Sequence, residues 1–239
     1  MSDKDKTSNH LHDGHRERLR ERFIEHGLDG FNHHQILELL LYYSIPRRDT
    51  NEIAHRLIDE FGSFSGVFDA NYNDLCKVDG IGGNSASLIK LIPAICRAYM
   101  DDKQDEGTVL NTTEKAGKYL INKFIGHTEE VIYMICMDNK CRVLKTEMIG
   151  KGTMNAVGLS IRKMAEIAMR CSATCVILAH NHPHGTPLPS RGDVRTTISI
   201  VSALGALNIR VNDHIIVAGN EFVSMADSQE HKDIFLLGQ

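Results

Sequence analysis

The hydrophobic pattern of this 239-residue chain changes its period once, and that change limits the folds open to it. From Gly14 to about Tyr99 apolar residues recur at helical spacing, whereas after Asn111 short apolar strands alternate with amphipathic helices. The charged, aperiodic segment at 101–111, DDKQDEGTVLN, is typical of a linker. A chain of this length can bury one large core or two smaller ones. We therefore predict a disordered tail at 1–13, a helical domain at 14–100, a linker at 101–111 and an α/β domain at 112–239.

Helix start and stop signals subdivide the first domain. RERLRERFIEHG is an amphipathic helix that ends near Gly27, and HHQILELLLYYSI is an apolar helix that ends before Pro46. DTNEIAHRLIDEFG has Asp49 or Thr50 as its N-cap and ends at Gly62. Two further helices, in DANYNDLCKVDGIGG and NSASLIKLIPAICRAYM, flank a glycine turn.

Strands and helices alternate in the second domain. EEVIYMICMD and CRVLKTEMIG form a hairpin through residues 138–140. LSIRKMAEIAMRC is a helix, TCVILAH a short apolar strand and SRGDVRTTISIVSALGALN a helix, followed by strands in IRVNDHIIVAG and EFVSMA. This alternation predicts an α/β sandwich, so that the whole chain combines a helical domain with an α/β domain.

Composition limits the partners and the location. The net charge of −4, with neither half basic, gives no global attraction to nucleic acid or to an anionic membrane. No apolar stretch reaches the roughly 18–20 residues that span a bilayer, and the polar N-terminus lacks the core of a signal peptide. We expect a cytoplasmic protein. The six cysteines never occur at CxxC spacing, which favours reduced thiols over a structural zinc site.

The glycine turn at 75–89 is a candidate nucleic-acid contact. Its pattern, L75-x-x-V78-x-G80-I81-G82-x-x-x-A86-x-x-I89, resembles the helix-hairpin-helix motif. Around Gly80 and Gly82, open backbone N–H groups and the next helix N-terminus can hold a DNA phosphate, with Lys77 nearby. The alternative is a turn that only joins two packed helices or docks a partner. Arginines between 16 and 22 and at 47–48 would supply a basic edge or a solvated, salt-bridged face.

The stretch 177–193, ILAHNHPHGTPLPSRGD, contains a candidate metal site. His180 ends a strand and His182 follows at the two-residue spacing that turns both imidazoles to one side. Asp193 lies in the first turn of the next helix. Two imidazoles and one carboxylate leave one position of a tetrahedral zinc site open, as in catalytic sites. Ser190 and Asp193 also fit a helix N-cap, with a serine at the cap and an acid three residues on.

A family resemblance links these residues. The string H180-x-H182-P183-x6-S190-x2-D193 looks like the metal box of the JAB/MPN metalloprotease domain, and its setting resembles the RadC family. Segments at 14–23, 38–63, 75–89, 150–155 and 211–219 also resemble that family. The resemblance implies a helical N-terminal domain with a helix-hairpin-helix element, followed by a JAB domain of cytidine-deaminase-like α/β architecture. It also implies Zn²⁺ on His180, His182 and Asp193, with Ser190 steadying an oxyanion.

One catalytic residue departs from the family pattern. In active members a glutamate early in the helix before the histidine strand accepts a proton and passes it to the leaving amine. Counting from Gly152 without gaps, the matching segment is 160–163, which places Lys163 where the acid is expected. An ammonium group only donates hydrogen bonds. The substitutes are a deprotonated Lys163, Glu166 one turn further on, and His184 beside the metal box.

Two functions follow from these residues. The first is a zinc-dependent hydrolase of peptide or isopeptide bonds, with a peptide or protein substrate. The second is a non-catalytic member that binds a protein partner or DNA through the hairpin turn, as the family's association with DNA repair suggests. Lys163 favours the second. A deaminase would need a P-C-x-x-C set, and Cys171 and Cys175 have the wrong spacing for one.

Overall fold

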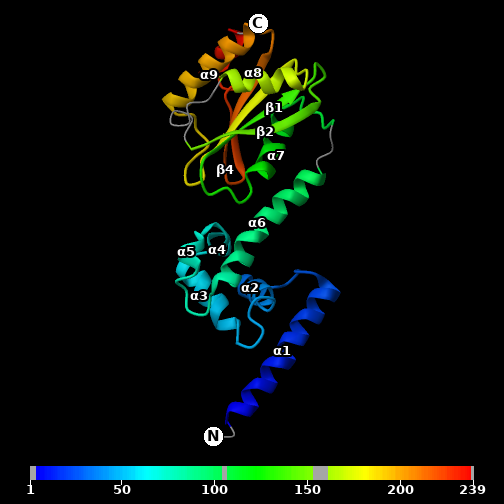
Figure 1. Ribbon diagram of the computed structural model, residues 1–239, viewed down its shortest axis with the longest axis vertical. Coiled ribbons are helices and arrows are strands. Elements are labelled where there is room, and N and C mark those ends of the chain that lie inside the picture. Colours follow the sequence, from blue (N-terminus) through cyan, green and yellow to red (C-terminus); the bar gives the residue numbers. More distant parts are fainter. Residues whose placement is uncertain (1–3, 104–106, 153–160, 238–239) are drawn as a thin grey trace. The chain divides into compact units, whose positions relative to one another are not determined.

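A computed structural model describes residues 4–103, 107–152 and 161–237, with side chains described from Gly14 onward (Figure 1). The chain divides into two compact units, residues 1–95 and 96–239. The first unit is helical and the second is built around a mixed sheet. The fold class predicted from the sequence is therefore confirmed.

The helical unit contains five complete helices and the start of a sixth among its described residues. They are α1 (Lys4–His26), α2 (His33–Leu41), α3 (Asn51–Phe61), α4 (Phe64–Asp69), α5 (Tyr72–Leu75) and α6 (Gly83–Lys103). The core contains apolar residues of α2 to α6, among them the fully buried Leu37, Leu57 and Ile89. This core holds the glycine turn between α5 and α6 in place.

The start of α3 shows how the two N-cap candidates share the task. Thr50 occupies the N-cap position, but its hydroxyl donates to the carbonyl of Glu38. The carboxylate of Asp49 accepts from the backbone N–H of Asn51 at 2.9 Å. The helix start was therefore placed correctly, and the side-chain hydrogen bond comes from the residue before the cap.

Two boundaries differ from the expectation. Helix α1 begins at Lys4, so residues 4–13 are helical instead of disordered, since no glycine or proline precedes Gly14 to interrupt the helix. Helix α6 continues to Lys103, into the segment expected to be the linker. Further along that segment, Leu110 donates to the carbonyl of Cys141, and Val143 donates to that of Thr108. The second half of the expected linker therefore belongs to the second unit, where it is hydrogen-bonded to the segment around Cys141 and Val143.

The second unit is a five-stranded sheet with the order β2-β1-β3-β4-β5. Its strands are β1 (Val131–Met137), β2 (Val143–Lys151), β3 (Cys175–Asn181), β4 (Arg210–Ala218) and β5 (Glu221–Ser224). The strands β3 and β4 are parallel, and the other neighbours are antiparallel. The β1–β2 hairpin was predicted, and Asp138 caps its turn by accepting from the N–H groups of Lys140 and Arg142.

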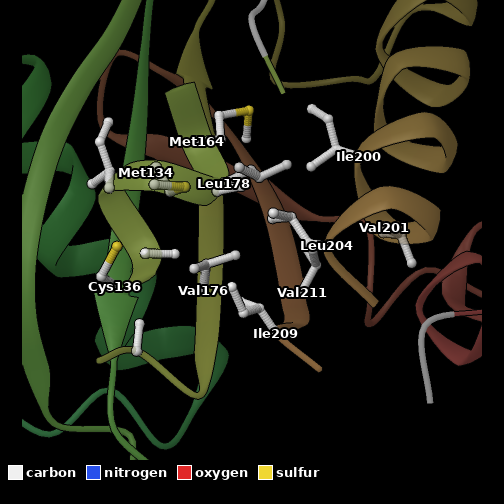
Figure 2. Packing of buried hydrophobic residues seen from close by; sticks show 14 of the residues in the cluster. Met134, Cys136, Met164, Val176, Leu178, Ile200, Val201, Leu204, Ile209 and Val211 are labelled. Atoms are coloured by element: carbon white, nitrogen blue, oxygen red, sulfur yellow. The ribbon is translucent and has the colours of Figure 1, made fainter. Parts of the chain in front are cut away.

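Helices cover both faces of this sheet. On one face α8 (Ile161–Arg170) and α9 (Arg191–Gly205) pack on alternate strand residues such as Met134, Val176 and Leu178 (Figure 2). On the other face α7 (Thr113–Phe124) packs on the intervening residues of β1, β3 and β4, such as Ile135 (Figure 1). The central strands β1 and β3 are thus buried on both sides along their whole length, which explains their continuous apolar runs in the sequence.

The cysteines and the possibility of a membrane-spanning helix were both assessed from the composition. All six cysteines are free, with Cys136 and Cys175 buried, and burial raises the pKa of both thiols. Among the described residues, none of the helices combines the length and the apolar character needed to cross a bilayer.

Candidate metal centre

The end of β3 and the start of α9 bring together the three predicted ligands. His180 has the same pleat parity as Leu178, so its imidazole points to the face covered by α8 and α9. His182 follows the strand, and its backbone N–H donates to the carbonyl of Val217 on β4. Asp193 is the third residue of α9. The two-residue spacing and the strand-to-helix connection thus produce the convergence expected from the sequence.

The three ligand atoms form a compact group. The Nε2 atoms of His180 and His182 are 3.0 Å apart, and Oδ2 of Asp193 lies 3.6 Å from the first and 4.0 Å from the second. His180 and Asp193 are buried, and His182 is half-buried. One His–His–Asp group with this proximity is found among the described residues.

Both histidines turn one specific nitrogen into the group. Nδ1 of His182 lies 2.8 Å from the carbonyl oxygen of Thr186, which can only accept, so this ring nitrogen carries the proton. Nδ1 of His180 lies 2.8 Å from Nε2 of His214. Only the two Nε2 atoms face Asp193. Two imidazole nitrogens and one carboxylate are a donor set that zinc accepts, and the residues therefore fit the metal.

Asp193 is also part of a helix cap. Its carboxylate accepts from the backbone N–H of Ser190 at 2.7 Å, and its own N–H donates to the Ser190 hydroxyl at 3.2 Å. The predicted helix cap is therefore confirmed, and the same carboxylate also faces the two histidines. Burial alone would raise the pKa of Asp193, but contacts with His180 and Ser190 outweigh it and hold that pKa well below its usual range.

Comparison with known proteins agrees with this geometry. A family model described as the RadC-like JAB domain matches residues 110–231, and one described as UPF0758 N-terminal matches residues 14–87. A UPF0758 protein of Fusobacterium nucleatum subsp. nucleatum is 36% identical over 237 residues, covering 95% of this chain and 98% of the relative. This chain belongs to the RadC-like JAB family. The sequence resemblance is thereby confirmed.

The residues predicted to assist the metal, as oxyanion helper or as base, all have exposed side chains. Ser190 is exposed at the start of α9, and His184 is exposed on the loop between β3 and α9. On α8, Lys163 and Glu166 are both exposed, and Glu166 pairs with Arg162 at 3.1 Å. Neither Glu166 nor His184 belongs to the ligand group among the described residues. Thr153 and Ser160, used to align Lys163, lie outside those residues.

Two buried polar residues of the RadC-like domain were not predicted to belong to the site. His214 on β4 is fully buried against His180, and burial holds its pKa well below the usual range. Thr197 on α9 is also fully buried, and its hydroxyl contacts His214 at 2.6 Å. The sequence signal for His214 is a histidine inside the apolar strand IRVNDHIIVAG, where burial requires a hydrogen-bonding partner.

The hairpin turn between α5 and α6 has few free cations. Lys77 pairs with Asp74 at 2.7 Å, and Lys90 donates to the carbonyl of Phe68. A neighbouring hollow of about 390 Å³ is lined by Arg56, Asp59, Glu60, Lys77, Val78 and Asp79. Carboxylates outnumber cations in this hollow.

Three of the arginines proposed as a basic edge, all on α1, are also engaged. Arg16 donates to the carbonyls of Ile45 and Pro46. Arg20 pairs with Glu17, and Arg22 donates to the carbonyl of Gly30. Of these three, Arg20 alone forms an ion pair within the described residues, and the other two bind backbone carbonyls.

Proposed function

We propose that this protein is a zinc-binding member of the RadC-like family, with a site of the peptide- or isopeptide-hydrolase type that lacks the family's general base. The observation that carries the proposal is the convergence of the Nε2 atoms of His180 and His182 with a carboxylate oxygen of Asp193 at the end of β3. His180, His182 and Asp193 would hold the metal. Bound zinc would polarise a substrate carbonyl and lower the pKa of water.

The chain's own residues set the rest of the chemistry. Ser190, exposed at the N-cap of α9, is suited to donate its hydroxyl proton to a developing oxyanion beside the metal. Hydrolysis also requires an acceptor for the proton of water, and an ammonium at position 163 cannot accept one. Glu166, one turn further along α8, is already paired with Arg162 at 3.1 Å. We therefore expect zinc binding without ordinary peptidase turnover.

The test combines metal analysis with one gain-of-function variant. The zinc content of the purified full chain is measured first, and one zinc per chain is expected. Hydrolysis of a broad peptide and isopeptide library is then compared for the natural chain, Lys163→Glu and Lys163→Gln. Lys163→Gln is the matched control, since it removes the positive charge without adding a proton acceptor.

Each outcome decides between the alternatives. Hydrolysis by Lys163→Glu alone supports the proposal. Hydrolysis by the natural chain that is lost in Glu166→Gln would identify Glu166 as the base and overturn the assignment at 163. A chain that takes up no zinc at stoichiometric supply would overturn the metal site itself.

A further inference from the structure

A chain of buried hydrogen bonds leads from the metal ligand His180 to helix α9. Nδ1 of His180 lies 2.8 Å from Nε2 of His214, and Nδ1 of His214 lies 2.6 Å from the hydroxyl of Thr197. That hydroxyl lies 2.7 Å from the backbone carbonyl of Asp193, the third ligand. His180, His214, Thr197 and Asp193 are all buried, so water does not compete for these bonds.

The hydrogen bond from Thr197 to Asp193 gives a direction to every proton in this chain. A carbonyl oxygen only accepts, and the Thr197 hydroxyl donates its single proton to that of Asp193. The hydroxyl oxygen then accepts from Nδ1–H of His214, whose Nε2 is left with a lone pair. That lone pair accepts from Nδ1–H of His180. His180 is thereby left with an unprotonated Nε2, the atom that faces the other two ligands.

We propose that Thr197 is a positioning residue for the metal site, because its hydroxyl, acting through His214, holds His180 in the tautomer that leaves Nε2 open to zinc. This inference rests on the proposed zinc site. A metal-binding histidine usually donates its second ring N–H to a carboxylate, a carbonyl or water, which accept without ambiguity. Here the partner is another imidazole, which can present either a donor or an acceptor. A third group must therefore determine which ring nitrogen of His214 carries the proton.

The competing tautomer shows what Thr197 prevents. If Nε2 of His214 carried the proton, it would donate to Nδ1 of His180, and Nε2–H of His180 could then donate to Nε2 of His182, 3.0 Å away. That arrangement would satisfy the two ligands with each other and block the metal. It would also require Thr197 to turn its hydroxyl proton to Nδ1 of His214, 2.6 Å away, and to give up the hydrogen bond to the Asp193 carbonyl. The lost hydrogen bond to Asp193 is what disfavours this arrangement.

Two substitutions distinguish the effect of the Thr197 hydroxyl from the effect of its side-chain packing. Thr197→Val keeps the shape of the side chain and removes the hydroxyl, whereas Thr197→Ser keeps the hydroxyl. Zinc affinity of the full chain is measured against a competing chelator. The tautomers of His180 and His214 are read in the zinc-free protein from their ring ¹⁵N chemical shifts. Circular dichroism checks that each variant folds.

We expect Thr197→Val to bind zinc about 10- to 100-fold more weakly, the range found for lost partners of metal ligands, and to gain the Nε2–H tautomer of His180. Thr197→Ser should remain close to the natural chain in both measurements. Natural-chain affinity and tautomer in Thr197→Val would overturn the inference. So would an Nε2–H tautomer of His180 in the natural zinc-free chain, which needs no variant to fold. Failure of the natural chain to bind zinc would instead overturn the proposed function, with the tautomers still measurable.

Discussion

The Nε2 atoms of His180 and His182 face each other across 3.0 Å, and the Nδ1 atom of each ring is engaged elsewhere. With both Nε2 atoms unprotonated, as proposed above, their lone pairs and the Asp193 carboxylate would repel one another until a cation lies between them. Folding would then assemble the site at an electrostatic cost that metal binding relieves. Because zinc would bind the folded chain and not the unfolded one, saturating zinc should raise the melting temperature. By mass action the gain is about 2.7 kcal/mol at 100 times the Kd.

The capping and metal roles of Asp193 can be separated by two variants. Asp193→Asn keeps an oxygen that can accept from the N–H of Ser190, so the helix cap and the zinc-free stability should change little, while the anionic ligand is lost. We expect zinc affinity to fall at least tenfold. Ser190→Ala should show the reverse, with stability reduced by about 1 kcal/mol and zinc affinity retained. Chelator competition and urea unfolding measure the two effects, and loss of zinc binding in both variants would mean that the cap itself builds the site.

Asn181 anchors the strand end that carries both histidines. Its Oδ1 accepts from the N–H of Val131 at 2.7 Å, and its Nδ2 donates to the carbonyl of Glu129 at 3.2 Å. It is buried, so Asn181→Ala should leave two unsatisfied backbone groups and cost about 1–3 kcal/mol of unfolding free energy. Asn181→Asp is the comparison, since it keeps the acceptor for Val131 and replaces the donor to Glu129 with a charged carboxylate oxygen. An alanine variant as stable as the natural chain in urea unfolding would contradict this role.

The three candidate ligands could be predicted from the sequence, whereas the buried residues that contact them, such as His214, could not. His180 and His182 are two residues apart and Asp193 lies one connection away, so local periodicity was enough to bring them together. His214 is 34 residues from His180, and they meet only because β3 and β4 pair in parallel with Leu178 opposite His214. Register between distant strands depends on tertiary packing, which one sequence does not specify.

Helix α7 was missed for a different reason. Its segment, TEKAGKYLINKF, follows the charged linker directly, although its buried residues Ala116, Tyr119, Leu120 and Phe124 recur at helical spacing. The helix becomes recognisable through its cap, where the Thr112 side chain accepts from the N–H of Lys115, and through the sheet face that buries Leu120. The N-cap and the helical spacing were thus both present in the sequence, next to a segment whose charge masked them.

Only one glycine of the hairpin turn is suited to testing the DNA hypothesis. Gly80 has a φ of +92°, and a Cβ there would lie 2.7 Å from a side-chain carbon of the buried Ile53. Gly80→Ala should therefore destabilise the helical unit by about 1–3 kcal/mol whatever the turn binds. A Cβ at Gly82 meets nothing within 4 Å, so Gly82→Leu should keep the natural stability.

If the turn holds a DNA phosphate through its backbone, Gly82→Leu should abolish a salt-dependent affinity for DNA while thermal stability is retained. Gly82→Ala is the milder control. Affinity that is unchanged in Gly82→Leu would exclude the turn as the contact, and DNA binding would then require another surface.

His127, in the loop after α7, should make the stability of the second unit depend on pH. Burial, together with the positive charges of Arg97 and Lys151, lowers its pKa to about 4, whereas an unfolded histidine titrates near 6.5. The unfolded chain therefore takes up a proton between these values that the folded chain does not. The stability due to neutral His127 is complete above about pH 6.5 and is lost as the pH falls towards 4. NMR titration measures the pKa directly, and His127→Gln should lose less stability between pH 7 and 5 than the natural chain. A His127 that titrates near 6.5 in the folded protein would contradict the prediction.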